Sequence, residues 1–386
     1  MNEKVLLLGS SFSAMPFLTR LKKRNFDVFV CGKHADDPCH QHADGSFHID
    51  YSDPEAVLSI ARQGNFKYVI PSCNDASYFS GAYTASKLGL PGYDSLAVTN
   101  ILHLKSEFRK FTAEHSVSAP RAIYCSRTTT PAASEIHYPA LIKPVDNFSG
   151  NGISLVNRAE ELSAALERAF LATRHDQVLI EEYVTGSLHS HSAFIKDGAI
   201  ALDFFVDEFC TVYPYQVNCS NHPSRITKKI REDVRQSMED IISKLGLADG
   251  LLHTQFMQDG EQHWIIECMR RCPGDMYNLL VEESTGIDYS EYYLNGFLQV
   301  PSQPCAPTTN RYMARHTISS DKPTGFLSFS CSIPSDKISI VPLKTSGHAL
   351  EQAPSDKIGI LFAEFPDQST LEETTPHLAA LTKILS

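Results

Sequence analysis

Apolar and polar residues alternate in blocks along the first hundred residues. Short apolar runs at VLLLG (5–9), DVFVCG (27–32) and YVIPS (68–72) have the length of buried strands, and the segments between them, SAMPFLTRLKKR and DPEAVLSIARQ, have helical character. Strands that alternate with helices indicate a parallel sheet with helices on its faces. We therefore predict an α/β protein with an N-terminal parallel-sheet domain over residues 1–100.

The pattern beyond residue 100 predicts a larger second unit. A helix from about Asn100 that contains Lys105 leads to strands near Ala122 and Ile142, and further helices are expected over 159–172 and 230–245. Asp259-Gly260 is a strong hairpin turn between GLLHTQFM and HWIIECM, and it places Gln255 near Glu267. After the proline-rich stretch 301–307, short strands and a final helix predict a small C-terminal α+β module, residues 301–386.

The segment 138–156, YPALIKPVDNFSGNGISLV, combines a strand, a lysine, a glycine-rich loop and a second strand. Lys143 places a positive charge at the end of an apolar run, and Gly150 and Gly152 allow the backbone to turn with its N–H groups exposed to an anion. The lysine precedes the glycines, so this is not a Walker P-loop. The pattern fits a flexible loop over phosphates, and it fits an ordinary hairpin with an exposed lysine about equally well.

Composition excludes several classes of function. A length of 386 residues indicates two or three domains, and a net charge of −11 without any basic block argues against nucleic-acid binding. No apolar stretch approaches the roughly 20 residues of a membrane span, and the start of the chain does not resemble a signal peptide. The ten cysteines include no CxxC pair, which fits the reducing cytoplasm. The first βα turn lacks the glycines of a dinucleotide site.

Four features occur in a fixed order: Lys105, the Lys143 loop, the run Glu181-Glu182-Tyr183-Val184, and Glu267 followed by Arg271. In this order and spacing the chain resembles the ATP-grasp superfamily of carboxylate–amine ligases over about residues 1–300. The tail from Arg311 is similar to the L-amino-acid ligase branch. The resemblance implies a pre-ATP-grasp domain (1–100), an ATP-grasp domain (101–300) made of two α+β subdomains (101–177 and 178–300), and the C-terminal module.

The resemblance also implies site residues. Lys105 and Lys143 would contact the phosphates of ATP, and the loop 146–152 would close over them. Residues with an implied role in nucleotide binding are Lys105, Lys143, Ser149, Gly150, Gly152, Glu181, Glu182, Tyr183 and Val184. Gln255 and Glu267 would hold Mg2+, with Mn2+ as an alternative ion, and Arg271 and Lys143 would be catalytic.

The chain departs from the family pattern at several positions. Leu188 stands where the family has a glutamate for the ribose hydroxyls. Ser187 or His189 could substitute, or His189 and His191 could be alternating polar residues on a half-exposed strand. Gln255 replaces a family acid, and Met269 replaces a family asparagine, although a thioether is a poor ligand for magnesium.

Two further points stay open. Arg270 and Asp275 could contact a substrate carboxylate or pair with each other. The expected reaction activates a carboxylate as an acyl phosphate and joins it to an amine, with small, amino-acid-like substrates and a homodimer as an open possibility. The alternatives are a catalytically reduced ATP-grasp protein that binds a nucleotide or metabolite, and a bicarbonate-using carboxylase. No Met-Lys-Met biotin attachment segment occurs in the chain.

Overall fold

The computed structural model describes residues 2–146, 150 and 152–386. Its N-terminal domain contains the predicted parallel sheet, in the order β3-β2-β1-β4, with β1 Lys4–Leu8, β2 Asp27–Cys31, β3 Gly45–Phe47 and β4 Tyr68–Pro71. Helices α1 Met15–Lys23, α2 Pro54–Gly64 and α3 Asp75–Leu88 follow its strands. Val5 and Leu7 pack into one core and Leu6 and Leu8 into another. Both faces of β1 are therefore covered, which explains its uninterrupted apolar sequence.

The region predicted as the lysine subdomain, residues 101–177, contains helix α5 Lys105–Glu114, preceded by α4 Leu96–His103, and its bounds stay a prediction. The single helix that we predicted from Asn100 is wrong, because Leu104 adopts an extended conformation (φ −97°, ψ 116°) and separates two helices. Lys105 is therefore the first residue of α5, and its N–H lies 3.4 Å from the carbonyl oxygen of Val145. The break brings this lysine to the end of the Lys143 strand.

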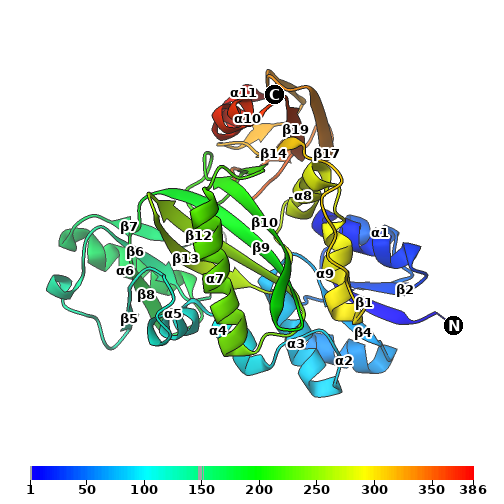
Figure 1. Ribbon diagram of the computed structural model, residues 1–386, viewed down its shortest axis with the longest axis horizontal. Helices are drawn as coiled ribbons and strands as arrows, with labels where there is room; N and C mark the ends of the chain where they lie inside the picture. Colours follow the sequence, from blue (N-terminus) through cyan, green and yellow to red (C-terminus); the bar gives the residue numbers. More distant parts are fainter. Residues whose placement is uncertain (1, 147–149, 151) are drawn as a thin grey trace.

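An antiparallel sheet in the order β5-β8-β6-β7 completes this region, with helix α6 Leu162–Ala172 packed on it. Its strands are β5 Ala122–Ser126, β6 Ala140–Pro144, β7 Ser154–Val156 and β8 Gln177–Glu182. The two predicted strands and the place of the lysine are confirmed, since Lys143 lies in β6 and Ala140 pairs with Val156 of β7, while residues 147–149 and 151 of the predicted loop lie outside the described residues. Figure 1 shows this sheet on the opposite side of the large central sheet from the N-terminal domain.

The largest sheet in the described part of the chain has eight strands, in the order β13-β12-β9-β10-β11-β14-β19-β17. The strands are β9 Ser187–Lys196, β10 Ala199–Phe209, β11 Cys219–His222, β12 Gly250–Asp259, β13 Gln262–Met269, β14 Tyr312–Ile318, β17 Lys337–Pro342 and β19 Gly359–Phe365. Helix α7 Lys228–Leu245 packs its apolar stripe on one face (Figure 1). On the other face, Phe194 and Phe204 pack against helices α8 Tyr277–Thr285 and α9 Tyr289–Leu298.

The C-terminal residues extend this sheet, because β14 pairs with β11 of the preceding region. Two short strand pairs and two helices also belong to the C-terminal part of the chain, which is drawn from orange to red in Figure 1. They are β15 Thr324–Gly325 with β18 Ala349–Leu350, β16 Ser328–Cys331 with β20 Thr382–Leu385, α10 Gln368–Thr374 and α11 Leu378–Leu381. The boundary at residue 301 stays a prediction. Among the described helices, none has the length and apolar character required to cross a bilayer.

Candidate functional site

A cleft of about 990 Å³ lies between the N-terminal domain, the lysine subdomain and the large sheet. It brings together most of the residues that the sequence singled out. The lining includes Lys105, Lys143, Gly150, Glu181, Glu182, Tyr183, Val184, Gln255, Glu267 and Arg271. Gly152 is not part of the lining, and Ser149 lies outside the described residues. Lys143 and Glu267, which are distant in sequence, thus face one common cavity.

Lys143 is buried in an ion-pair cluster at one end of the cleft. Its side chain is 7% exposed and its ammonium contacts Oε1 of Glu181, while Nε of Arg109 donates to Oε2 of the same carboxylate at 2.8 Å. The alternative of an exposed hairpin lysine is therefore wrong. Burial lowers the pKa of Lys143, Glu181 opposes this shift, and the charges of Arg109 and Lys105 lower the pKa further. Both predicted lysines line the same cleft.

The sequence analysis missed Arg109. This residue is 4% exposed, and its Nη2 also donates to the carbonyl oxygen of Ile266 at 2.7 Å. It links the lysine subdomain to strand β13, one residue before Glu267. The local sequence gives no signal for these contacts, because a polar residue between Phe108 and Phe111 is expected to face solvent on an amphipathic helix.

The described glycines of the loop have the conformation that the sequence predicted. Gly150 and Gly152 have φ values of +73° and +78°, a region that L side chains rarely adopt. A Cβ atom on Gly150 would lie 3.0 Å from the carbonyl oxygen of Pro214, so the loop passes close to the segment that follows β10. A Cβ atom on Gly152 would meet Pro144 and Ala172 at 2.7 Å.

The run 181–184 forms the edge between the two subdomains. The side chain of Glu181 is occupied by Lys143 and Arg109, and that of Glu182 pairs with Arg121 at 3.0 Å. The N–H of Tyr183 donates to Pro139, at 3.3 Å. The nucleotide-binding role of Glu181, Glu182, Tyr183 and Val184 stays a prediction.

The two metal-binding candidates lie on the two strands of the predicted hairpin. Gln255 and Glu267 are direct cross-strand partners on β12 and β13. Nε2 of Gln255 donates to Glu208 of β10, a residue that the sequence analysis missed. The signal available for Glu208 was a pair of consecutive acids, Asp207 and Glu208, in the otherwise apolar strand segment FFVDEF. Burial raises the pKa of Glu208 to about 7, and nearby Glu267 contributes to the shift.

These oxygen donors fit magnesium that is delivered with phosphates. Mg2+ prefers hard oxygen ligands and is usually held by one or two carboxylates together with substrate phosphates. The described residues contain no preformed group of three or more His, Cys, Asp or Glu side chains suited to a metal. Glu267, Gln255 and Glu208 supply carboxylate and amide oxygens, whereas Met269, which also lines the cleft, offers only sulfur.

The two consecutive arginines have different surroundings. Nη2 of Arg271 lies 2.7 Å from Oδ2 of Asp75, and its side chain lines the cleft. Arg270 is 3% exposed and pairs with Asp94 at 2.7 Å. Asp275 pairs with Lys357 and Thr317. The alternative in which Arg270 and Asp275 pair with each other is therefore wrong, and Arg270 is a structural residue.

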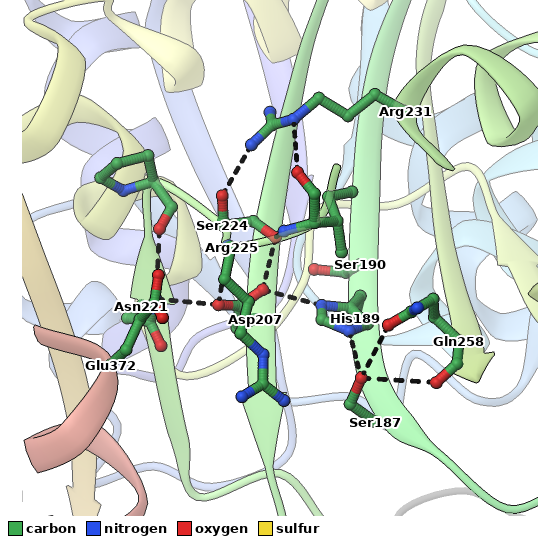
Figure 2. A network of polar contacts seen from close by, with 12 residues as sticks. Ser187, His189, Ser190, Asp207, Asn221, Ser224, Arg225, Arg231, Gln258 and Glu372 are labelled. Atoms are coloured by element: carbon green, nitrogen blue, oxygen red, sulfur yellow. Dashed lines mark hydrogen bonds and ion pairs between the residues drawn. The ribbon is translucent and has the colours of Figure 1, made fainter. Parts of the chain in front are cut away.

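His189 and His191 are both fully buried, so the prediction of a half-exposed strand is wrong. Nδ1 of His189 lies 2.7 Å from Asp207, and Nε2 lies 2.6 Å from the hydroxyl of Ser187. Figure 2 shows Asp207 between His189, Asn221 and the Ser224–Arg225 segment. The network joins β9 and β10 to the loop before α7. His191 pairs with Asp203 at 2.9 Å.

Comparison with known proteins agrees with this geometry. Residues 136–277 match the family described as ATP-grasp domain. Formate-dependent phosphoribosylglycinamide formyltransferase of Wolinella succinogenes is 23% identical over 252 residues, which cover 63% of each chain and thus less than two thirds of that relative.

Two solved structures have the same fold over the whole chain. The L-amino acid ligase from Bacillus licheniformis has a TM-score of 0.80 at 16% identity and covers 100% of this chain and 98% of its own. The phosphoribosylglycinamide synthetase from Anaerococcus prevotii has a TM-score of 0.77 at 17% identity and covers 100% of both chains.

Fold and cleft together define a mixed α/β protein whose phosphate-binding candidates and metal-binding candidates face each other across two subdomains. Residues 136–277 match the ATP-grasp domain family, and the whole chain has the fold of the two solved structures. ATP with Mg2+ is characteristic of this family.

Proposed function

We propose that the protein is an ATP-dependent ligase that joins a carboxylate to an amine through an acyl phosphate. The observation that carries this proposal is that Lys143, the Gln255–Glu267 pair and Arg271 line one cleft. A carboxylate does not react with an amine at neutral pH because oxide is a poor leaving group. Phosphorylation of the carboxylate by ATP converts that oxygen into a phosphate, which the amine can displace.

The residues of the cleft have distinct tasks in this scheme. The ammonium of Lys143 has three N–H donors, and Glu181 fixes its position while donors remain for phosphate oxygens. Lys105 adds a second positive charge. Arg271, held by Asp75, stabilises negative charge that develops on the acyl phosphate and on the tetrahedral species formed by the amine. Bound magnesium would neutralise phosphate charge, with Glu267 and Gln255 as its protein ligands.

The substrate pair is proposed as small and amino-acid-like. Arg225, Arg315 and Lys357 line the cleft together with Arg271, and these cations favour a substrate that carries a carboxylate or a phosphate. The relative from Wolinella succinogenes is named for formate and phosphoribosylglycinamide. Formate therefore belongs among the carboxylates to be tested.

The test is a product assay with purified protein, ATP and Mg2+. Amino acids and formate are offered as carboxylates in pairs with amines, and bicarbonate is offered separately. We expect ADP, phosphate and a coupled product that appear only when both substrates are present, with Lys143→Ala as the inactive control. Bicarbonate-dependent ATP hydrolysis would favour a carboxylase. Tight ATP binding without ADP under every condition would favour a catalytically reduced protein.

A further inference from the structure

Glu208 is close to both positions where this chain lacks a family acid, Leu188 and Gln255. It is the direct cross-strand partner of Leu188, on β9. Through β9 it also lies diagonal to Gln255, because Leu188 pairs with Met257 and Ser190 pairs with Gln255. Directly paired residues, and residues two apart on one strand, point to the same face of a sheet. Glu208, Leu188, Gln255 and Glu267 therefore share the face that lines the cleft.

The carboxylate of Glu208 is buried and has no ion-pair partner among the described residues, although the charge of Arg315 acts on it. The residue is 5% exposed, and no lysine, arginine or histidine forms an ion pair with it within the described residues. The other buried acids of this region differ, since Glu181, Asp75 and Asp94 all pair with a basic side chain. A buried carboxylate is costly unless a positive charge compensates it. Its acidic neighbour Glu267 increases this shortage of positive charge.

The contact with Gln255 decides which atom of the amide faces the cleft. Nε2 of Gln255 donates to Oε2 of Glu208, so the amide nitrogen is occupied. The carbonyl oxygen Oε1, which is the only atom of the amide that can bind a cation, then points away from Glu208. Outer-shell carboxylates that hold a ligand in this way orient it and increase its affinity for a metal.

We propose that Glu208 and Gln255 together replace the missing family carboxylate of the magnesium site. Gln255 supplies the ligand oxygen, and Glu208 supplies the negative charge and fixes the amide. Glu208 is thus a positioning residue for the metal ion, displaced by two strands from the position where the family carries its acid. This inference rests on the proposed use of ATP with Mg2+.

The experiment measures Mn2+ binding to the full chain in the presence of the β,γ-imido analogue of ATP, by electron paramagnetic resonance of free Mn2+. Glu208→Gln keeps an oxygen that accepts the hydrogen bond from Gln255 and removes only the charge. We expect Mn2+ affinity to fall by about 10- to 100-fold. In the double variant Glu208→Gln/Gln255→Glu the charge returns to the family position, and affinity should recover to the wild-type value. Glu283→Gln, an acid outside the cleft, is the matched control.

Three results would overturn the proposal: unchanged Mn2+ affinity in Glu208→Gln, an equal loss in Glu283→Gln, or no recovery in the double variant. If Glu208→Gln does not fold, as judged by circular dichroism, the double variant alone decides, because it must bind Mn2+ like the wild type. Affinity of wild-type protein for the imido analogue is measured first. If the wild type does not bind the analogue, the proposed function fails, which is a different result from a failure of the Glu208 assignment.

Discussion

Arg271 and Asp75 form an ion pair of 2.7 Å although 196 positions separate them in the chain. Asp75 is the first residue of α3 in the N-terminal domain, and its other carboxylate oxygen lies 3.1 Å from Nδ1 of His103. Burial raises the pKa of Asp75, but the charges of Arg271 and His103 outweigh burial and hold the pKa well below its usual range. The N-terminal domain therefore fixes the orientation of an arginine in the cleft.

We expect Arg271→Ala to lower kcat by about 10²- to 10³-fold, the usual loss when one donor to a developing oxyanion is removed. Asp75→Asn keeps a hydrogen-bonding side chain but removes the charge that orients the guanidinium. It should lower kcat by about tenfold to 100-fold with a smaller change in KM, because misplacement acts on the reacting geometry. Steady-state kinetics of the ligation check both values. Wild-type kinetics in Asp75→Asn would show that the ion pair has no part in positioning Arg271.

The neighbouring Arg270→Ala should act on stability. Its guanidinium is 3% exposed and contacts Asp94 at 2.7 Å and the carbonyl oxygen of Leu251 at 2.8 Å. Loss of this partner leaves a buried carboxylate uncompensated, at a cost of about 3–5 kcal/mol in the free energy of unfolding. Urea denaturation measures this loss in the free energy of unfolding. The control is Arg311→Ala, which removes a more exposed pair with Glu364 and should cost less than about 1 kcal/mol.

Helix α5 offers two lysines for a matched test of phosphate binding. Lys105 lines the cleft, whereas Lys110 of the same helix pairs with Glu107 on the surface. We expect Lys105→Ala to weaken binding of the imido analogue of ATP by about 1.5–3 kcal/mol, the contribution of a hydrogen bond to a charged group. Lys110→Ala should leave the dissociation constant unchanged in isothermal titration calorimetry. Equal affinities of both variants would remove Lys105 from the nucleotide site.

The Lys143–Glu181–Arg109 cluster predicts a stability loss in acid. Burial raises the pKa of Glu181, but the charges of Arg109 and Lys143 outweigh burial, and the net pKa is lowered from 4.5. The unfolded chain therefore binds a proton at a higher pH than the folded chain does. Stability from this group is present above pH 4.5 and is lost as pH falls from there through the folded pKa.

Urea midpoints at a series of pH values between 7 and 3 test this relationship. In Glu181→Gln the protein should be less stable at pH 7, because two buried cations lose their partner, but the acid-dependent loss should be smaller than in the wild type. Glu182→Gln is the control, since its pair with Arg121 is largely exposed and contributes little. A wild-type pH dependence in Glu181→Gln would mean that other acids cause the loss.

The parts of the site that the sequence predicted depend on interactions between residues that are close in the chain. The Asp259-Gly260 turn predicted the hairpin that brings Gln255 near Glu267, and a register shift between Gln255 and Phe256 makes these two residues direct partners. The apolar run before Lys143 placed that lysine in a strand. Local rules failed at Leu104, because leucine favours helices and nothing in its neighbours signals the break.

Arg109 and Glu208 were missed for a different reason. Their roles depend on which elements are neighbours in the folded protein, where β9 lies between β12 and β10 and Arg109 of α5 reaches β13. The contact of Arg109 with Ile266 spans 157 positions, and that of Glu208 with Gln255 joins strands that are not consecutive in the chain. The buried histidines differ, because their aspartate partners lie on β10, the strand that directly follows β9 in the chain.

The continuity of the large sheet from β11 into β14 limits how this protein can be divided. A fragment that ends before residue 312 would leave the backbone N–H and C=O groups on the β14 side of β11 without partners, and an unpaired strand edge of this kind promotes association between molecules. It would also remove Arg315, whose Nη2 donates to Ser220 of β11 at 2.8 Å. Truncation studies should therefore keep the last 75 or so residues. Recombination between relatives would have to exchange these residues together with β11.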